Sequence, residues 1–305
     1  MINFQELIQG TYPGKLTRAG AYLTNLLEEN DEPILTQFKF FRLIRKMYAE
    51  GKGKKLYLRH DNPTMDDHIR LSRTLKKAGI IGTDRDYGTR AIRVLSVSDK
   101  PAENIICLID PTCYVSHLSA MRRWGLTDRN SEALILTRPD RIRALDAIKK
   151  IMDANLIGDE TTPFPIKLVN HPNKVRRRSV KMYETKSAGA SIVDRSDGIR
   201  LSTIGQTFLD TLQKPEYCGG MAHILDVWTE HAKTHVEEIV EAVDGATSNL
   251  VKSRAGYILE EKIGIKHSGI EPWKAFGQRG SSRKLDPSKE FASTFSETWM
   301  ISLNV

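Results

Sequence analysis

The chain has 305 residues, of which 40% are hydrophobic and 28% charged, with a formal net charge of +8. That composition is typical of a soluble globular protein, no stretch approaches the roughly 18 uninterrupted apolar residues of a membrane helix, and the N-terminus lacks signal-peptide features, so we expect a cytoplasmic protein. The three cysteines, Cys107, Cys113 and Cys218, are odd in number and lack metal-ligand spacing, which argues against a zinc site and a disulfide framework.

Two amphipathic helices are predicted within the first fifty residues. One face of the first carries Leu16, Ala19, Leu23, Leu26 and Leu27, and one face of the second carries Phe38, Phe41, Ile44, Met47 and Tyr48. The link that follows, EGKGKKLYLRHDNP, is longer than the turn of a minimal helix-turn-helix. Its basic residues, Lys52, Lys54, Lys55 and Arg59, could contact phosphates.

A third, basic helix is predicted over residues 64–79. Thr64 can cap it, with Asp67 in the acidic position of a capping box, and Gly79 ends it. At 3.6 residues per turn, five residues fall on one broad arc of this helix: Met65, Ile69, Leu71, Leu75 and Ala78. We expect this arc to pack against the rest of the domain. The other, cationic face holds Arg70, Arg73 and Lys77.

A hairpin is predicted directly after this helix. Ile80 and Ile81 begin an extended run, residues 86–88 have turn composition, and residues 90–97 alternate arginine with apolar side chains. Three helices followed by a hairpin are the order of a winged helix-turn-helix, whose wing would carry Arg85 and Arg90.

Double-stranded DNA is the partner that this module predicts. Residues 39–93 hold 15 Lys or Arg against 6 Asp or Glu, so the positive charge is concentrated here. We expect Arg70, Arg73 and Lys77 on base edges, and the linker lysines and wing arginines on phosphates. Changing Arg70 and Arg73 together to Ala should abolish specific operator binding. A merely solvated helix face and a protein-binding winged helix stay open as alternatives.

The rest of the chain predicts a second domain. A polar stretch with a proline at residues 96–103 separates a first domain, residues 1–98, from a second, residues 104–305. In the second we expect a strand at 104–109, helices at 112–124 and 141–155, strands at 165–170, 180–183 and 192–201, and mostly helices from residue 203. The predicted fold is α+β, a winged helix-turn-helix followed by a mixed α/β domain with a helical C-terminal part.

No catalytic, metal or cofactor site is expected in the second domain. Ser116 and His117 would point about 100° apart on a helix, without a nucleophile elbow. His231 and His235 are four positions apart on a predicted helix and could share a metal, with Glu238 near. Their face of that helix also carries apolar residues, which favours packed histidines. We therefore expect a non-enzymatic protein, with a DNA-targeted nuclease as an alternative.

A second basic run could extend a DNA footprint or bind an acidic partner. It consists of Lys174, Arg176, Arg177 and Arg178. A solvated loop explains the same run equally well.

Four phrases of the second domain resemble the AbiEi antitoxin family, in the expected order. They are YVSHLSAMRRWGLTDR (114–129), STIGQTFLDTLQKPEYCGGMAHIL (202–225), SRAGYILEEKIGI (253–265), and a tail that runs from a Leu-Asp-Pro turn at 285–287 to a closing Trp-to-Asn strand at 299–304. The family places a winged helix before this domain, which agrees with the N-terminal pattern. The Gly-Lys linker and the run at Lys174 have no counterpart in the family pattern.

The resemblance implies an antitoxin of a type IV toxin-antitoxin system, with a role in phage defence. Such antitoxins repress their own operon by binding inverted repeats in its promoter. They also counteract an AbiEii-like nucleotidyltransferase toxin, without a stable complex with it. The alternative is a winged-helix transcriptional regulator whose C-terminal domain senses a ligand or partner.

Overall fold

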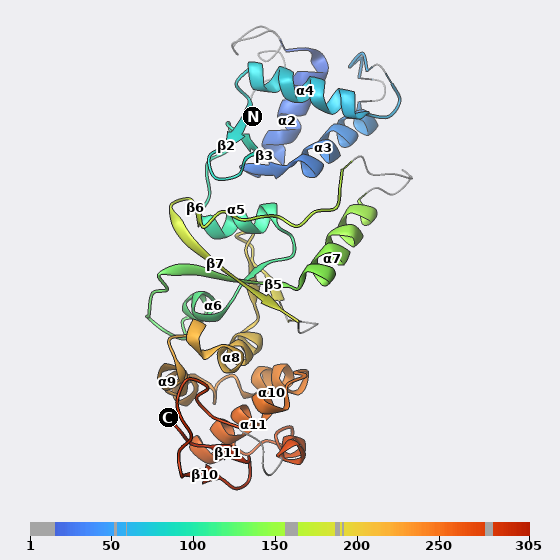
Figure 1. Ribbon diagram of the computed structural model, residues 1–305. Coiled ribbons are helices and arrows are strands. Elements are labelled where there is room, and N and C mark those ends of the chain that lie inside the picture. The colour runs from blue at the N-terminus through green and yellow to red at the C-terminus, as the bar shows by residue number, and fades with distance from the viewer. Residues whose placement is uncertain are drawn as a thin grey trace. The chain divides into compact units, whose positions relative to one another are not determined.

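The chain is a mixed α+β protein with several sheets (Figure 1). The computed structural model describes residues 16–51, 54–58, 60–155, 164–186, 190, 192–277 and 283–305. Two compact units divide the chain: Met1–Thr112 with Arg141–Arg178, and Cys113–Asp140 with Ser179–Val305. None of the helices in the described residues is long and apolar enough to cross a membrane. The domain boundary expected between residues 98 and 104 stays a prediction.

Three helices form the N-terminal part of the first unit: α2 (Arg18–Glu29), α3 (Gln37–Glu50) and α4 (Met65–Lys77). Each begins at a threonine whose side chain accepts a backbone N–H of the first turn, which satisfies an otherwise unpaired donor. The predicted apolar faces of α2 and α3 form the core, in which Leu23, Leu27, Ile44 and Met47 are fully buried.

A three-stranded antiparallel sheet completes this part. Its strands are β1 (Ile34–Thr36), β2 (Ile81–Asp84) and β3 (Gly88–Val94), in the order β1-β3-β2. The hairpin β2-β3 was predicted, whereas β1 was not, because three residues are too few to show an alternating pattern. β1 pairs with β3 from Ile34 opposite Arg93 to Thr36 opposite Ala91.

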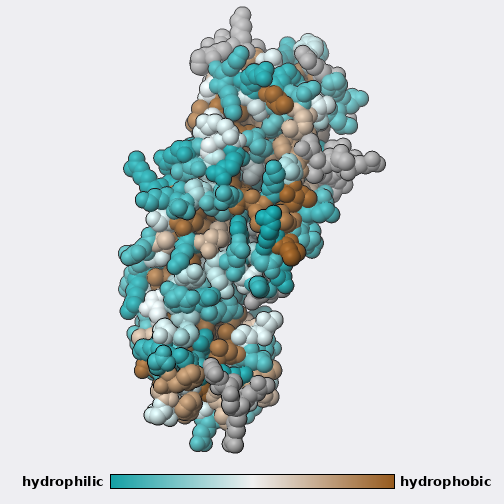
Figure 2. Space-filling model, viewed as in Figure 1, coloured by the Kyte–Doolittle hydropathy of each residue, from teal (hydrophilic) through white to brown (hydrophobic). Residues whose placement is uncertain are grey.

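The first unit also contains α5 (Ala102–Ile109), α7 (Arg141–Ala154) and β6 (Lys174–Val175). The prediction of a strand at 104–109 is wrong, since these residues lie in α5. A short apolar run that is buried on all sides does not distinguish strand from helix. Residues 165–170, expected as a strand, are irregular, and α7 matches its prediction closely. Figure 2 shows hydrophobic side chains gathered over α7, where Ile142 and Ile151 are exposed.

The second unit is built on a sheet whose strands run in the order β7-β5-β4-β9-β8. Their bounds are β4 (Tyr114–Val115), β5 (Ala133–Pro139), β7 (Arg178–Thr185), β8 (Ile192–Asp194) and β9 (Arg200–Ser202). β5 pairs parallel with β7 and β4 pairs parallel with β9, while β4-β5 and β8-β9 are antiparallel. The strand expected at 192–201 is therefore two strands, and β5 was not predicted.

The rest of the second unit consists mostly of helices, and the mostly helical region expected from residue 203 is present. The helices are α6 (His117–Arg123), α8 (Ile204–Gln213), α9 (Met221–His231), α10 (Val236–Asp244) and α11 (Asn249–Gly256), with a π-helical turn at Tyr257–Lys262 and short 3-10 turns at Pro215–Tyr217 and Glu271–Phe276. The strand pair β10 (Phe295–Ser296) and β11 (Ile301–Ser302) closes the chain. Trp228, Trp273 and Trp299 are fully buried in the core of this unit.

Candidate nucleic-acid interface

A capping box fixes the start of α4. The Thr64 hydroxyl accepts the Asp67 N–H, and the Asp67 carboxylate accepts the Thr64 N–H at 3.1 Å. The same carboxylate binds Arg70 Nη2 at 2.6 Å. Burial alone would raise the pKa of Asp67, but the hydrogen bonds from Arg70 and Thr64 outweigh it and lower that pKa to about 2. Arg70 is therefore tied to its own helix.

The exposed face of α4 carries Ile69, Arg73, Lys76 and Lys77. The expectation that Ile69 packs is wrong, because its side chain is 49% exposed. Ile69 lies two positions before the buried Leu71 and is therefore about 200° around the helix from it. The predicted packing of Leu71, Leu75 and Ala78 is confirmed.

An open groove of about 400 Å³ runs along this face. Ile69, Arg73 and Lys76 line it from α4, while Gln37 of α3 and Ile92 of β3 line its other side. Ile69 and Lys76 were not predicted to belong to this surface. The i, i+4, i+7 spacing of Ile69, Arg73 and Lys76 is the signal that places them together.

The linker before α4 contributes less basic surface than its composition indicates. Lys52 lies outside the described residues. Lys54 Nζ donates to the Tyr22 hydroxyl at 2.9 Å, a contact that raises the pKa of Lys54. Lys55 is exposed and has a φ of 52°, in the left-handed region. Lys55 is thus available to an anionic partner, while Lys54 is already hydrogen-bonded to Tyr22.

The wing arginines are both held by the protein. Arg85 Nη2 lies 3.1 Å from Asp99 at an exposed position. Arg90 donates from Nη1 to the Asn170 carbonyl at 2.7 Å and from Nε to the Tyr87 carbonyl at 3.2 Å. Arg85 lies in the turn and Arg90 lies in β3, two residues after its start, and both side chains remain exposed.

Arg176 lies at the centre of three carboxylates. Its Nη2 is 2.6 Å from Asp84 and its Nε is 2.9 Å from Asp99, and its Nη1 binds Asp86. The side chain is only 6% exposed. Burial alone would raise the pKa of Asp84, yet the hydrogen bonds from Arg176 and from the backbone of the turn bring it below its ordinary value. Arg176 therefore anchors the β2-β3 turn and offers little charge to a partner.

The other members of this basic run differ among themselves. Lys174 and Arg177 are exposed. Arg178 Nη1 lies 3.4 Å from Glu103 of α5, which is a loose ion pair. The surface that this run presents is therefore carried chiefly by Lys174 and Arg177.

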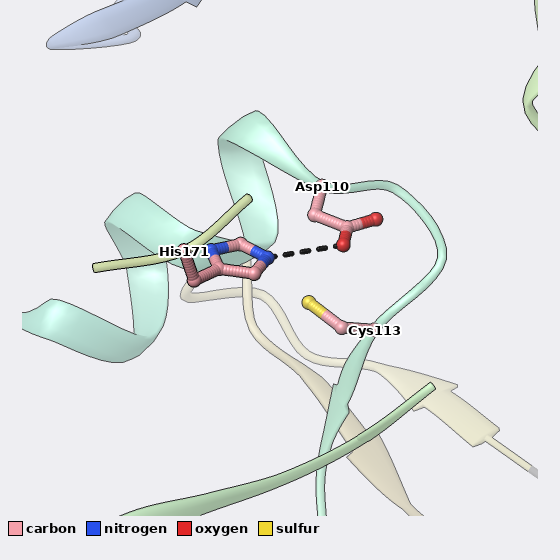
Figure 3. A group of neighbouring side chains, drawn as sticks. All are labelled: Asp110, Cys113 and His171. Atoms are coloured by element: carbon pink, nitrogen blue, oxygen red, sulfur yellow. Dashed lines mark hydrogen bonds and ion pairs between the residues drawn. The ribbon is translucent and has the colours of Figure 1, made fainter. Parts of the chain in front are cut away.

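A buried hydrogen-bonded chain also reaches the hairpin turn. The Tyr87 hydroxyl contacts His171 Nδ1 at 2.9 Å. His171 Nε2 contacts Asp110 Oδ2 at 3.1 Å (Figure 3). Asp110 Oδ1 accepts from the Thr112 backbone at 2.8 Å. Cys113, also drawn in Figure 3, is the first residue of the second unit. These hydrogen bonds link the hairpin turn, the segment after α7 and the end of α5 within the first unit.

The histidines of the second unit do not form the arrangements considered from the sequence. Ser116 and His117 are not successive residues of one helix, because Ser116 precedes α6 and His117 has a φ of 50°. His117 Nδ1 therefore reaches Ser116 Oγ at 2.8 Å, and both are completely buried. Burial lowers the pKa of His117 to about 3.

The helix expected to carry both His231 and His235 is interrupted. α9 ends at His231, and His235 precedes α10. His231 lies 3.8 Å from Glu230, and His235 lies 3.6 Å from Glu238. The apolar residues of the predicted face, Ile224, Trp228, Ile239 and Val243, are all fully buried.

Comparison with known proteins gives a distant structural likeness. No family model matches the sequence, and no curated protein matches it. The chain is similar to the crystal structure of the RV2827C protein from Mycobacterium tuberculosis, with a TM-score of 0.49, 10% identity, and coverage of 95% of this chain and 93% of that one. A likeness at this level carries no argument about function.

Proposed function

We propose that the chain binds double-stranded DNA through α4, within a winged helix-turn-helix formed by α2, α3, α4 and the β2-β3 hairpin. The observation that carries this proposal is the exposed face of α4, on which Arg73, Lys76 and Lys77 border an open groove. A helix of this diameter fits the major groove, where arginine and lysine recognise guanine edges and phosphates. Lys55 and the hairpin would contact the backbone.

The purpose that we propose for this binding is autorepression by an antitoxin. Its support is the set of four AbiEi-like phrases in residues 114–304, together with a basic helix in the N-terminal part. The target would be inverted repeats in the promoter of its own operon. The functional partner would be an AbiEii-like nucleotidyltransferase toxin, without a stable complex.

The double variant Arg73→Ala, Lys77→Ala tests DNA binding directly. Its affinity for a labelled fragment of the upstream promoter, measured by fluorescence anisotropy, should fall at least about tenfold, since each base or phosphate interaction contributes on the order of 1–3 kcal/mol. Lys149→Ala, Lys150→Ala removes the same charge from exposed positions of α7 and is the matched control. It should bind within about twofold of the wild type.

Salt dependence is the second readout of the same experiment. The slope of log affinity against log salt should be smaller in the α4 variant by about one for each phosphate that its side chains no longer neutralise. Equal affinities and slopes for the α4 and α7 variants would show that α4 is not the DNA-binding face.

The alternative function is a regulator whose C-terminal part senses a ligand or partner unrelated to any toxin. The gene next to the one encoding this chain separates the two functions, because only an antitoxin requires a neighbouring nucleotidyltransferase. Restoration of growth when the neighbour and this chain are expressed together would support the antitoxin.

A further inference from the structure

A polar cavity of about 350 Å³ lies within the second unit, between the sheet, α8 and α10. Tyr114 of β4, Thr137 of β5 and Tyr183 of β7 line one side, and Gln206 and Asp210 of α8 line another. Its volume is at the lower end of those that hold small molecules. The DNA-binding proposal does not involve this cavity.

Asp210 is the unusual residue of the cavity. Its side chain is almost completely buried, at 3% exposure. Oδ1 accepts a hydrogen bond from Gln206 Nε2 at 2.7 Å, whereas Oδ2 has no hydrogen-bond partner among the described residues. A buried carboxylate oxygen without a partner is costly, and its occurrence in a native site calls for a ligand or another role.

The charges around the cavity are all of one sign. Three carboxylates line it, those of Asp210, Glu238 and Glu241, and the described lining residues include no lysine, arginine or histidine. Glu238 and Glu241 are exposed at the rim, on α10. These charges disfavour an anionic ligand, and a cation would compensate the buried charge.

The spacing of these carboxylates favours an extended cation over a metal ion. In the described part of the chain, they do not form a group whose ligand atoms lie within 4.8 Å of one another. Ile204, Leu209, Ala242 and Ala246 add apolar side chains to the lining. A methylene chain with a charged group at each end would match both the carboxylates and the apolar part of this lining.

We propose that the cavity binds a small organic cation, an amine or guanidine, with its charged group beside the Asp210 carboxylate. Agmatine, which has a guanidinium and an ammonium joined by four methylenes, is the probe. One end would bind Asp210, and the other would lie near Glu238 and Glu241.

Isothermal titration of the full chain with agmatine tests the site. Wild type should bind one equivalent saturably, and Asp210→Asn should weaken binding at least about tenfold, because a hydrogen bond to a charged group is removed. Glu241→Gln, at an exposed rim position, should weaken it about threefold without disturbing the core. Asp226→Asn, an exposed carboxylate of α9 outside the cavity, should bind agmatine as the wild type does.

The affinity should also depend on pH with a defined sign. Burial raises the pKa of Asp210 to about 7, so the carboxylate that binds the cation forms mainly above that pH. Agmatine affinity should rise about tenfold from pH 6 to pH 8 in the wild type and stay constant in Asp210→Asn.

The groups that face Asp210 do not mask this effect. They are Tyr114 and Tyr183 of the sheet, Cys218 after α8, and the rim glutamates of α10. Burial raises the pKa of Tyr114, Tyr183 and Cys218 above its ordinary value, so these three groups stay neutral between pH 6 and pH 8.

Three outcomes would overturn the proposal. One is no saturable heat with agmatine or putrescine in the wild type up to about 10 mM, a range that covers the weakest specific affinities. Another is equal binding by the wild type and Asp210→Asn. The third is equal binding of the uncharged analogue N-butylurea, which would indicate a site for neutral polar molecules. None of these results bears on DNA binding by the first unit.

Discussion

The Asp67 carboxylate has two roles in α4: it accepts a hydrogen bond from the backbone N–H of the N-cap residue, and it forms an ion pair with Arg70. The carboxylate is buried, so its hydrogen bonds are shielded from water. Arg73 and Lys77 are exposed and are thereby distinguished from Arg70, although the sequence places all three on one face. At the level of single residues, the position of a charge on a helix does not say whether that charge is already paired.

Asp67→Asn should lower the stability of the chain by about 1 kcal/mol at pH 7, as loss of a cap commonly does. The difference from wild type should depend on pH. Because the folded-state pKa of Asp67 is lowered to about 2, its contribution is fully present above about pH 4 and is lost as the pH falls through about 2. Urea unfolding of both proteins at several pH values measures this difference.

Asp66→Asn is the matched control for that experiment. Asp66 also lies in the first turn of α4 but is exposed. Its substitution should change stability by no more than about 0.5 kcal/mol. A stability difference for Asp67→Asn that persists unchanged at pH 2 would contradict the role given to the ionised carboxylate.

The residue-level features that sequence predicted are the local ones. Thr64 and Asp67 are three positions apart, and a capping box is a pattern of that length. The partners of Arg176 are 92, 90 and 77 positions away, and no periodicity connects them. The carboxylate of Asp210, whose Oδ2 lacks a partner among the described residues, was missed for the same reason, since its surroundings come from the sheet and α10 as well as its own helix.

At the level of elements, Gly205 determines how closely α8 approaches α10. A Cβ at this position would lie 2.0 Å from the backbone oxygen of Glu238, which is far inside van der Waals contact. The two helices can thus pack backbone to backbone. Because both helices line the polar cavity, the same glycine sets the distance across it.

Gly205→Ala should therefore destabilise the chain by about 1–3 kcal/mol, because the new methyl group forces α8 and α10 apart. It should also weaken agmatine binding. Gly245→Ala is the control, since its Cβ would meet its nearest atoms at 3.7 Å and fits without strain. Thermal unfolding compares the two variants, and an equal stability of both would refute the close approach.

Elements with long, clear periodicity were predicted well, and short ones were not. α3, α4 and α7 show repeated apolar positions over three or more turns. α5 is eight residues long and buried on nearly every side, so its sequence resembles a buried strand. β5 was missed because the sheet neighbours that define it, β4 and β7, are themselves short or distant in sequence.

At the level of the whole molecule, the two proposed activities are assigned to different parts of the chain. The exposed basic face of α4 belongs to the first unit, and the four AbiEi-like phrases lie in the second. Repression and toxin neutralisation should then be separable by mutation.

The variant Arg73→Ala, Lys77→Ala should lose repression but keep neutralisation. A reporter driven by the chain's own promoter should be derepressed several-fold, since affinity falls about tenfold or more. Growth in the presence of the co-expressed neighbouring toxin should match that with the wild type. Loss of both activities at a normal protein level would show that neutralisation requires α4.

The carboxylates around Arg176 have a consequence for how the chain is made. Asp84, Asp86 and Asp99 leave the ribosome well before Arg176, which is translated 77 residues after the last of them. During that interval, about 4–15 s at usual rates of synthesis, Asp84, Asp86 and Asp99 lack the counterion that they share. The three ion pairs that hold the turn can form only once the arginine arrives, and a chain cut near residue 104 would never receive it.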